Sequence, residues 1–189
     1  MRYTTRVEEA CLNVHGATWS PPRDTGLIKR LVLDMGAPPQ VGPPGLALIG
    51  PGRRNLAEGR VAIAGFPTLD RTPLIRAGIS MGPVVVEVSR HVLPPAFEAS
   101  DWQDAAEFSV LVRDKTAYVG GFSQDHRTAS RIDSAGPGWY RLRVHAKGRA
   151  AAPDLVVAEP TEEYLIQVWR AGPAEPVALT GSVTQLIRA

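Results

Sequence analysis

The sequence predicts a mainly β protein, an antiparallel β-sandwich that follows a loop- and proline-rich N-terminal part. Short apolar runs alternate with polar residues over much of the chain, as in strands with one buried face. The 17 Pro and 18 Gly fall between these runs rather than in one tract. Such spacing is typical of many short strands joined by turns. We expect one domain over 1–189, with 1–82 as the N-terminal part and 83–189 as the clearer sandwich part.

The clearest strand lies at residues 138–148. Its even positions are apolar: Tyr140, Leu142, Val144 and Ala146. Its odd positions are basic: Arg141, Arg143, His145 and Lys147. Because successive strand side chains point to opposite sides, one face is suited to a core and the other to water or a partner.

The segment 161–169 is the expected antiparallel partner of this strand. Tyr164, Ile166 and Val168 repeat the same apolar alternation. The pairing would place Glu162 or Glu163 within reach of the basic row, where opposite charges across strands contribute about 0.2–1 kcal/mol.

The N-terminal part gives weaker signals. Residues 3–19 favour one or two strands broken near Glu8 and Glu9, with a helix over 6–12 as the competing interpretation. Prolines then interrupt regular structure. The other expected elements are a helix or strand at 27–34, strands at 46–49 and 60–65, and a crossover at 66–82 that could include a turn of helix at 73–77.

The rest of the sandwich part follows the same alternation. Val84, Val86 and Val88 share one strand face, and Phe108, Val110 and Val112 share another. The remaining expected elements are a hairpin between 107–113 and 116–122, a polar loop at 123–137 and a last strand near 177–183.

Composition excludes several classes of protein. The 44% hydrophobic and 21% charged residues are ordinary for a globular protein, and the net charge of +2 is too low and too scattered for a typical nucleic-acid binder. Cys11 is the single cysteine, so an intrachain disulfide is excluded. The first residues lack the apolar core of a signal peptide and no run approaches about 20 apolar residues, so we expect a cytoplasmic protein without a membrane partner.

No catalytic or metal motif is visible. The four histidines, His15, His91, His126 and His145, are isolated and lack metal-ligand spacing. Asp125 and His126 resemble part of a triad, but no serine lies in a nucleophile elbow. Adjacent carboxylates such as Glu162 and Glu163 diverge on a strand and cannot flank one bond. We therefore predict no catalytic residue, no metal and no cofactor.

The most suggestive surface combines aromatic and basic side chains on the two central strands. Tryptophan and arginine are enriched in binding hot spots. If this face is open, it could bind an acidic protein, a sugar or an extended polymer. If the N-terminal part covers it, its tryptophans belong to a core. The predicted binding residues are Trp139, Arg141, Arg143, His145, Gln167 and Trp169.

The segments 138–149 and 159–169 resemble strand motifs of short uncharacterised bacterial proteins similar to the competence protein J family of nuclease inhibitors. The resemblance covers about residues 84–169. It implies a β-sandwich that binds and neutralises another protein, as immunity proteins do. The slightly basic charge departs from the acidic character usual for such inhibitors, and no functional residue can be carried over.

We therefore predict a non-catalytic protein-binding domain of the immunity or nuclease-inhibitor type, whose partner is another protein such as a toxin or nuclease. Two alternatives stay open. One is a structural subunit of a larger assembly, with an oligomer in that case. The other is a hydrolase or metal-dependent enzyme whose site forms only after folding, for example by a gathering of histidines with carboxylates.

Overall fold

The structure is a computed structural model. The structure describes residues 1–7, 11–18, 49–51, 73–99, 101–113, 116–121, 124–125, 127–133 and 135–180. Within these ranges the regular structure is all strand, with no helix. This confirms the mainly β character that the alternation predicts.

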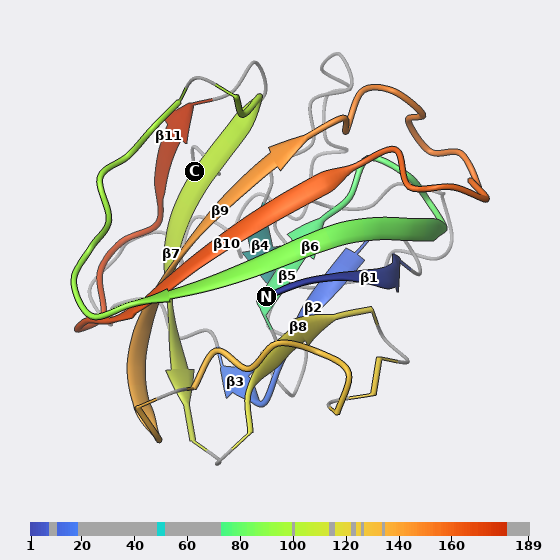
Figure 1. Cartoon of the computed structure of the whole chain (residues 1–189). Coiled ribbons are helices and arrows are strands. Elements are labelled where there is room, and N and C mark those ends of the chain that lie inside the picture. Colours follow the sequence, from blue (N-terminus) through green and yellow to red (C-terminus); the bar gives the residue numbers. More distant parts are fainter. Residues whose placement is uncertain are drawn as a thin grey trace, which may run out of the picture.

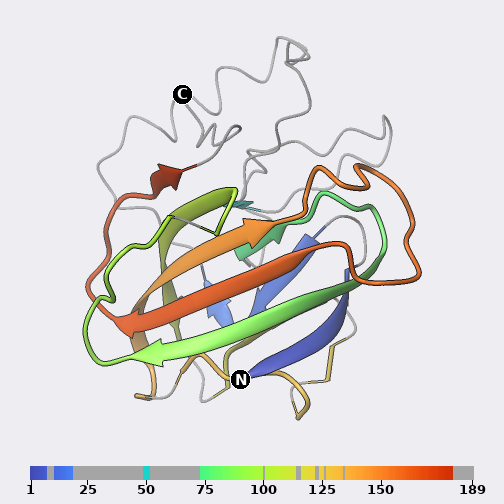
Figure 2. The same ribbon diagram turned by 45° about the horizontal axis from the view of Figure 1, so that its top comes forward.

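The larger of the two sheets holds most strands of the second half of the chain, together with β1, β3 and β6 (Figures 1 and 2). Its strand order is β1-β6-β10-β9-β7-β11, and β3 also pairs with β7. The bounds are β1 Arg2–Val7, β3 Ala17–Thr18, β6 Gly82–His91, β7 Asp104–Val112, β9 Gly138–Lys147, β10 Glu163–Arg170 and β11 Val177–Thr180.

The large sheet is mixed, which corrects the expected antiparallel order. β9 and β10 form the antiparallel pair that the sequence predicts, with Val144 opposite Ile166. However, β10 runs parallel to β6, with Ile166 opposite Val88. β6 and β7 therefore point the same way and are separated by β10 and β9, so the chain between them has to cross the sheet. Consecutive strands that run parallel in one sheet require such a crossover connection.

The smaller sheet has the order β4-β5-β2-β8. Its strands are β2 Cys11–His15, β4 Ile49–Pro51, β5 Pro73–Arg76 and β8 Tyr118–Gly120. β8 pairs with β2 and not with β7, so the expected hairpin between 107–113 and 116–122 is wrong. The turn of helix considered for 73–77 is also wrong, because Pro73–Arg76 is a strand paired with β2.

The two sheets share one hydrophobic core. Inward side chains of the large sheet, such as Phe108, Leu142 and Ile166, belong to the same buried cluster as Leu12 and Ile75 of the small sheet. Tyr140, Val144, Tyr164 and Val168 are buried in it as the alternation predicts. The structure thus shows a curled mixed sheet packed with a smaller one, and a regular sandwich remains a prediction.

Strand β1 links the edges of the two sheets. The Tyr3 hydroxyl donates to the Val119 carbonyl at 2.6 Å, and the Gly121 amide donates to Thr5 Oγ1 at 3.0 Å. Arg6, Val7 and Leu12 lie in strands, so the helix considered for 6–12 does not form at these positions.

Several expected elements lie outside the described residues. These are the helix or strand at 27–34, residues 46–48 of the strand expected at 46–49, and the strand at 60–65. The break near Glu8 and Glu9 also falls there.

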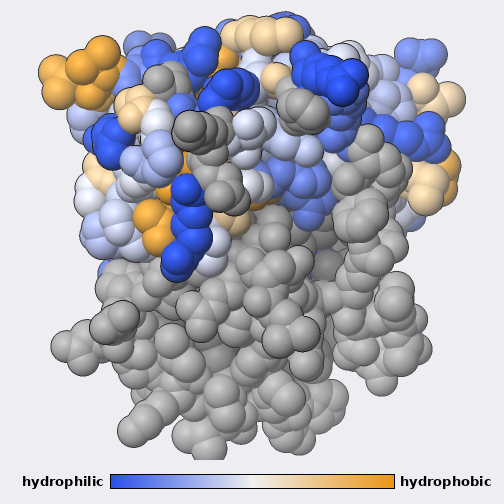
Figure 3. All heavy atoms as spheres, turned by 90° about the horizontal axis from the view of Figure 1, so that it is seen from below, coloured by the Kyte–Doolittle hydropathy of each residue, from blue (hydrophilic) through white to orange (hydrophobic). Residues whose placement is uncertain are grey.

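The described residues form a mostly polar surface on the face seen from below (Figure 3). Figure 3 shows hydrophilic residues over most of the coloured part of this face, with hydrophobic residues in separate groups. Within the described ranges we find no helical segment with the length and apolar character of a membrane span.

Candidate functional site

The six predicted binding residues come together on one side of the large sheet. Trp139, Arg141, Arg143 and His145 are on β9, and Gln167 and Trp169 are on β10. The antiparallel register sets Gln167 opposite Arg143 and Trp169 opposite Arg141. All six alternate with core residues, so they belong to the outer face of the sheet, away from the shared core.

This outer face is largely covered. Arg141 and Arg143 are each 6% exposed, His145 is 2% exposed and Trp169 is 4% exposed. Trp139 and Gln167 are half-buried. Contacts recorded for these side chains come from the connection between β6 and β7, residues 92–103, and from the connection between β10 and β11, residues 171–176.

The topology explains why the connection between β6 and β7, described at 92–99 and 101–103, lies on this face. β6 ends at His91, level with Trp169, whereas β7 begins at Asp104, level with Tyr164. The connection must therefore return along about five residues of strand, about 16 Å at 3.3 Å per residue, while it passes over β10 and β9. We call residues 92–103 the crossover segment.

A carboxylate on β7 compensates the buried guanidinium groups. Glu107 Oε1 lies 2.7 Å from Arg143 Nε, and Glu107 Oε2 lies 3.1 Å from Arg141 Nε. The Arg141 side chain also donates to the carbonyls of Ala174 and Glu175. Glu107 is the counter-ion that sequence reasoning missed, because its place opposite Arg143 depends on β7 being the neighbour of β9.

Arg143 fastens the crossover segment to the sheet. Its Nη1 donates to the carbonyls of Pro95 at 2.9 Å and Ala96 at 3.2 Å. Its guanidinium also lies 5.5 Å from the Phe97 ring centroid and 5.3 Å from that of Trp169. Cation–π contacts of this kind are attractive when the ring face is near the charge. Arg143 is thus used inside the fold and is not free for a partner.

His145 is held between two aromatic rings of the crossover segment. Its ring centroid lies 5.8 Å from that of Phe97 and 5.5 Å from that of Trp102. Its Nε2 contacts Gln167 Oε1 at 3.2 Å, which makes Nε2 the donor because an amide oxygen only accepts. Burial, together with the nearby Arg143 charge, lowers the pKa of His145 despite the opposing contacts of Gln167 and Glu107. The imidazole is therefore neutral near pH 7.

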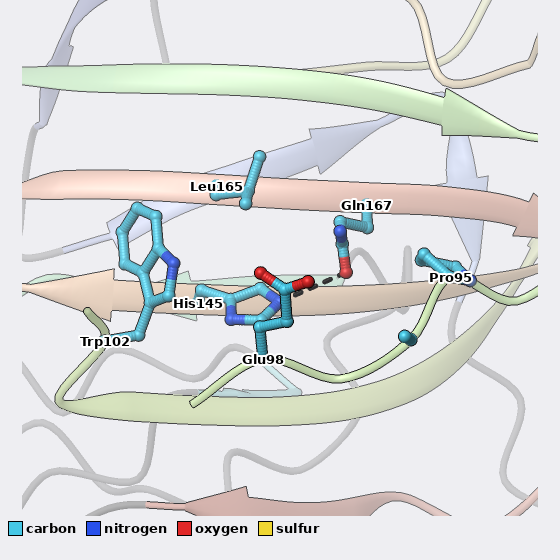
Figure 4. A pocket seen from close by; sticks show the side chains of 7 residues that line it. Pro95, Glu98, Trp102, His145, Leu165 and Gln167 are labelled. Atoms are coloured by element: carbon cyan, nitrogen blue, oxygen red, sulfur yellow. Dashed lines mark hydrogen bonds between the residues drawn. The ribbon is translucent and has the colours of Figure 1, made fainter. Parts of the chain in front are cut away.

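A pocket of about 220 Å³ opens beside this histidine (Figure 4). Trp102 and Pro95 lie on opposite sides of it, and the Glu98 carboxylate lies in front of the His145 ring. Among the described residues, no hydrogen bond or ion pair is recorded for the Glu98 carboxylate or for the Gln167 amide nitrogen. The lining residues are Pro95, Ala96, Glu98, Trp102, His145, Leu165 and Gln167.

The end of β6 and the start of the crossover segment are less covered. The crossover segment begins with Val92 and Leu93, which are 93% and 74% exposed. On β6, the Ser89 hydroxyl and His91 Nε2 form a hydrogen bond beside Gln167. Within the described part of the chain, no carboxylate is recorded as a partner of the His91 ring.

The described histidines do not gather in the way that the enzyme alternative requires. His15, on β2 of the small sheet, stacks on Tyr118 and contacts the Gly121 carbonyl, whereas His145 is on β9 of the large sheet. His126 lies outside the described residues. No group of three or more potential metal-ligating side chains occurs in the described ranges.

The adjacent carboxylates Glu162 and Glu163, at the start of β10, point in different directions, as expected for neighbouring positions of an extended chain. Glu163 lies 3.4 Å from Lys147 Nζ, as the cross-strand pairing predicts. Glu162 instead turns away from the basic row and is 1% exposed. It accepts the backbone amides of Gly78 and Ile79.

Comparisons with known proteins give little guidance. No protein-family model matches this chain, and no curated protein matches it. The chain is similar to a solved structure described as "Crocagin biosynthetic gene J", with a TM-score of 0.40 and 9% identity over 91% of this chain and 99% of that chain. A likeness at this level does not establish a shared function. The comparisons give no support to the resemblance to the competence protein J family.

Proposed function

We propose that this chain is a non-catalytic binding domain that docks a segment of another protein at the pocket beneath the crossover segment. The observation that carries the proposal is a pocket that combines apolar side chains with polar groups that have no partner among the described residues. Leu165 and Trp102 offer apolar surface, while the Glu98 carboxylate and the Gln167 amide nitrogen offer an acceptor and a donor. Sites with few polar groups on an apolar lining are typical of binding pockets.

The support around the pocket favours binding with little rearrangement. Arg143 ties the crossover segment to the sheet at two carbonyls, and His145 is packed between Phe97 and Trp102. A wall and floor that are already ordered reduce the entropy lost when a partner binds. Of the six predicted binding residues, His145 and Gln167 line the pocket. The others contribute mainly by supporting its shape.

The exposed start of the crossover segment extends this surface. Val92 and Leu93 precede the pocket residue Pro95 by two or three positions and are exposed to solvent. Contiguous exposed apolar surface is a feature of protein interaction sites, and these two side chains would contribute to it. The pocket and this apolar tip together suit an extended peptide segment better than a compact small molecule.

An inhibitor or immunity protein is the narrower form of the proposal. Its support is the strand pattern over residues 84–169. In that form the bound segment belongs to a nuclease or toxin. Titration of the chain into a nuclease from the same cells is expected to remove nuclease activity at a one-to-one ratio. Full activity with excess chain would reject this narrower form.

A peptide library tests the proposed function directly. We expect random 12-residue peptides displayed on phage to be enriched by the purified chain. Selected peptides should lose at least about tenfold in affinity with Leu165→Glu, because a carboxylate that binding would desolvate replaces apolar surface in the pocket. Val156→Glu, a control at a side chain 70% exposed and away from the pocket, should bind them unchanged. Enrichment that is equal for the wild type and Leu165→Glu would refute pocket docking.

A further inference from the structure

We propose that the crossover segment is a cover that acid releases: a proton taken up by His145 detaches this segment from β9 and β10 while the sheet stays folded. The inference goes beyond the proposed docking of a peptide, because it concerns a conformational device in the fold. Three observations carry it. The imidazole lies between the sheet and the cover, one of its ring nitrogens is buried without a partner, and positive charge is in excess beside it.

His145 is the point at which the cover packs on β9. Its ring centroid lies 5.8 Å from that of Phe97 and 5.5 Å from that of Trp102, and the residue is 2% exposed. Most residues of the crossover segment are themselves exposed. Segments with few buried contacts open more readily than the core of a fold. The packing of this segment therefore depends on a small number of side chains of β9.

The buried face of the imidazole has no place for a second proton. Nε2 donates to Gln167 Oε1 at 3.2 Å, so Nδ1 carries the lone pair of the neutral ring. Nδ1 of His145 is buried and has no hydrogen-bond partner among the described residues. A proton on Nδ1 would create a charged donor without an acceptor, which costs more than the neutral lone pair that it replaces. In the released form water accepts from this N–H.

The charges of β7 and β9 add to this cost. Arg141 and Arg143 share the single carboxylate of Glu107, at 3.1 and 2.7 Å, so one positive charge is in excess before His145 is protonated. Burial and the Arg143 charge lower the pKa of His145, and they outweigh the opposing contacts of Gln167 and Glu107. The closed form thus disfavours the imidazolium through both desolvation and like charge.

The other charged groups near the ring do not reverse this balance. Glu98 lies in front of the imidazole (Figure 4), but its side chain is exposed, as is that of Asp101 in the same segment. Lys147 adds charge of the same sign and lies 3.4 Å from Glu163. Aromatic rings attract an imidazolium, but the Phe97 ring already has the Arg143 guanidinium at 5.5 Å.

Release would expose the face that the sequence predicts as a binding surface. Arg143, His145 and Trp169 are buried in the closed form, and the cover contributes to this burial. Release would also take Pro95 and Trp102 out of the pocket lining, so a peptide docked in the pocket would dissociate in acid. This last consequence alone rests on the proposed function.

The direction of the pH dependence follows from the pKa of His145 in the two forms. The pKa is lowered in the closed form and returns toward about 6.5 once the ring is exposed to water. The closed form is therefore fully favoured above about pH 6.5. Below this value the ratio of open to closed molecules rises by up to about tenfold per pH unit, until the pH reaches the lower value of the closed form.

Hydrogen exchange at single amides, followed by nuclear magnetic resonance, tests the release. The Gln103 amide donates to the Ala146 carbonyl at 3.1 Å and ties the end of the cover to β9. We expect its protection factor, corrected for the intrinsic pH dependence of exchange, to fall by up to about tenfold between pH 7.5 and 5.5. The Ala174 amide, which donates to Ser109 Oγ at 3.1 Å in the other covering segment, should keep its protection factor.

Two variants identify the titrating group. His145→Phe keeps an aromatic ring at this position and cannot take up a proton, so the fall at Gln103 should disappear. His91→Gln is the matched control, because it removes a titratable ring that lies on β6 beside Ser89, and the fall should persist. The ring titration of His145 in the wild type supplies a measurement that does not depend on the folding of a variant.

Four outcomes would overturn the proposal. They are equal falls at Gln103 and Ala174, which indicate global unfolding; a fall that persists in His145→Phe; a His145 pKa at or above 6.5; and a rise of protection in acid, which would mean that Glu98 binds the charged ring. None of these measurements uses a peptide. Binding of library peptides at pH 7.5 is a separate experiment, so failure of the release and failure of the proposed docking are distinguishable.

Discussion

Glu107 and Arg143 face each other across β7 and β9, with the carboxylate oxygen 2.7 Å from the guanidinium Nε. Their side chains are 15% and 7% exposed, so the pair is largely shielded from water. The same carboxylate serves Arg141 at 3.1 Å. Two buried cations on one carboxylate are tolerated because backbone carbonyls of both covering segments accept their other N–H groups.

Removal of the Glu107 charge is expected to destabilise the fold. Glu107→Gln leaves Arg141 and Arg143 buried without their counter-ion, and loss of one member of a buried ion pair costs about 3 kcal/mol. Urea unfolding monitored by tryptophan fluorescence measures the change. Glu163→Gln is the matched control, because Glu163 pairs with partly exposed Lys147 and Arg2 and should cost less than about 1 kcal/mol. Equal costs for the two variants would contradict a structural role for the Glu107 pair.

Arg143→Lys is expected to loosen the crossover segment. Lysine keeps the charge but lacks the planar fork that reaches the Pro95 and Ala96 carbonyls. Loss of about 1.4 kcal/mol of local stability would speed hydrogen exchange in peptides spanning 92–99 about tenfold. Mass spectrometry of hydrogen exchange measures this rate.

Arg141→Lys provides the reciprocal control. Arg141 donates to the carbonyls of Ala174 and Glu175, so its replacement should speed exchange mainly at residues 171–176. If both variants increased the exchange rate equally in both segments, the hypothesis that each arginine stabilises its own segment would be wrong.

We expect the stability of the fold to depend on pH through His145, which lies on the same face of the sheet as Arg143. The pKa of His145 is lowered in the folded state, so the unfolded chain takes up a proton more readily. Stability is therefore complete above the unfolded pKa of about 6.5 and declines as the pH falls toward the lower folded value, by up to about 1.36 kcal/mol per pH unit. The charged or polar groups around this ring are Arg143, Glu107, Gln167, Glu98 and Lys147.

Urea unfolding at pH 7.5 and 5.5 tests this expectation. The loss of stability between the two values should be smaller in His145→Gln than in the wild type, because glutamine does not titrate. The titration of the His145 ring, followed by nuclear magnetic resonance, should give a pKa below 6.5. An unchanged pH dependence in His145→Gln, together with a His145 pKa at or above 6.5, would show that this group does not control it.

The local patterns could be predicted from sequence because they depend on neighbouring residues. Alternation along 138–147 and 163–170 fixes which side chains point inward, and the matching of Tyr164, Ile166 and Val168 to β9 follows from it. The six predicted binding residues indeed share one face. What alternation cannot say is whether that face is open to solvent.

The covering of that face depends on strand order, which local patterns do not specify. The crossover segment lies there because β6 and β7 are parallel and are separated by two strands. The sequence signal that this connection packs against the sheet is its two aromatic residues, Phe97 and Trp102, which follow Pro94 and Pro95. Glu107 gives a similar signal, since it lies on the polar face of β7, but its partners become evident only once β7 is placed beside β9.

A close backbone contact supplies the last prediction. A Cβ atom at Gly78 would lie 2.0 Å from the Arg149 backbone oxygen, and the Gly78 amide donates to Glu162 Oε2 at 3.2 Å. Gly78→Ala must push these segments apart and weaken the hydrogen bond, so we expect a loss of about 1–3 kcal/mol in the free energy of unfolding. Gly172→Ala is the matched control, because a Cβ there meets no atom within 4 Å and should change stability by less than about 0.5 kcal/mol. Urea unfolding of both variants measures the difference, and equal midpoints would show that the turn at Gly78 yields without cost.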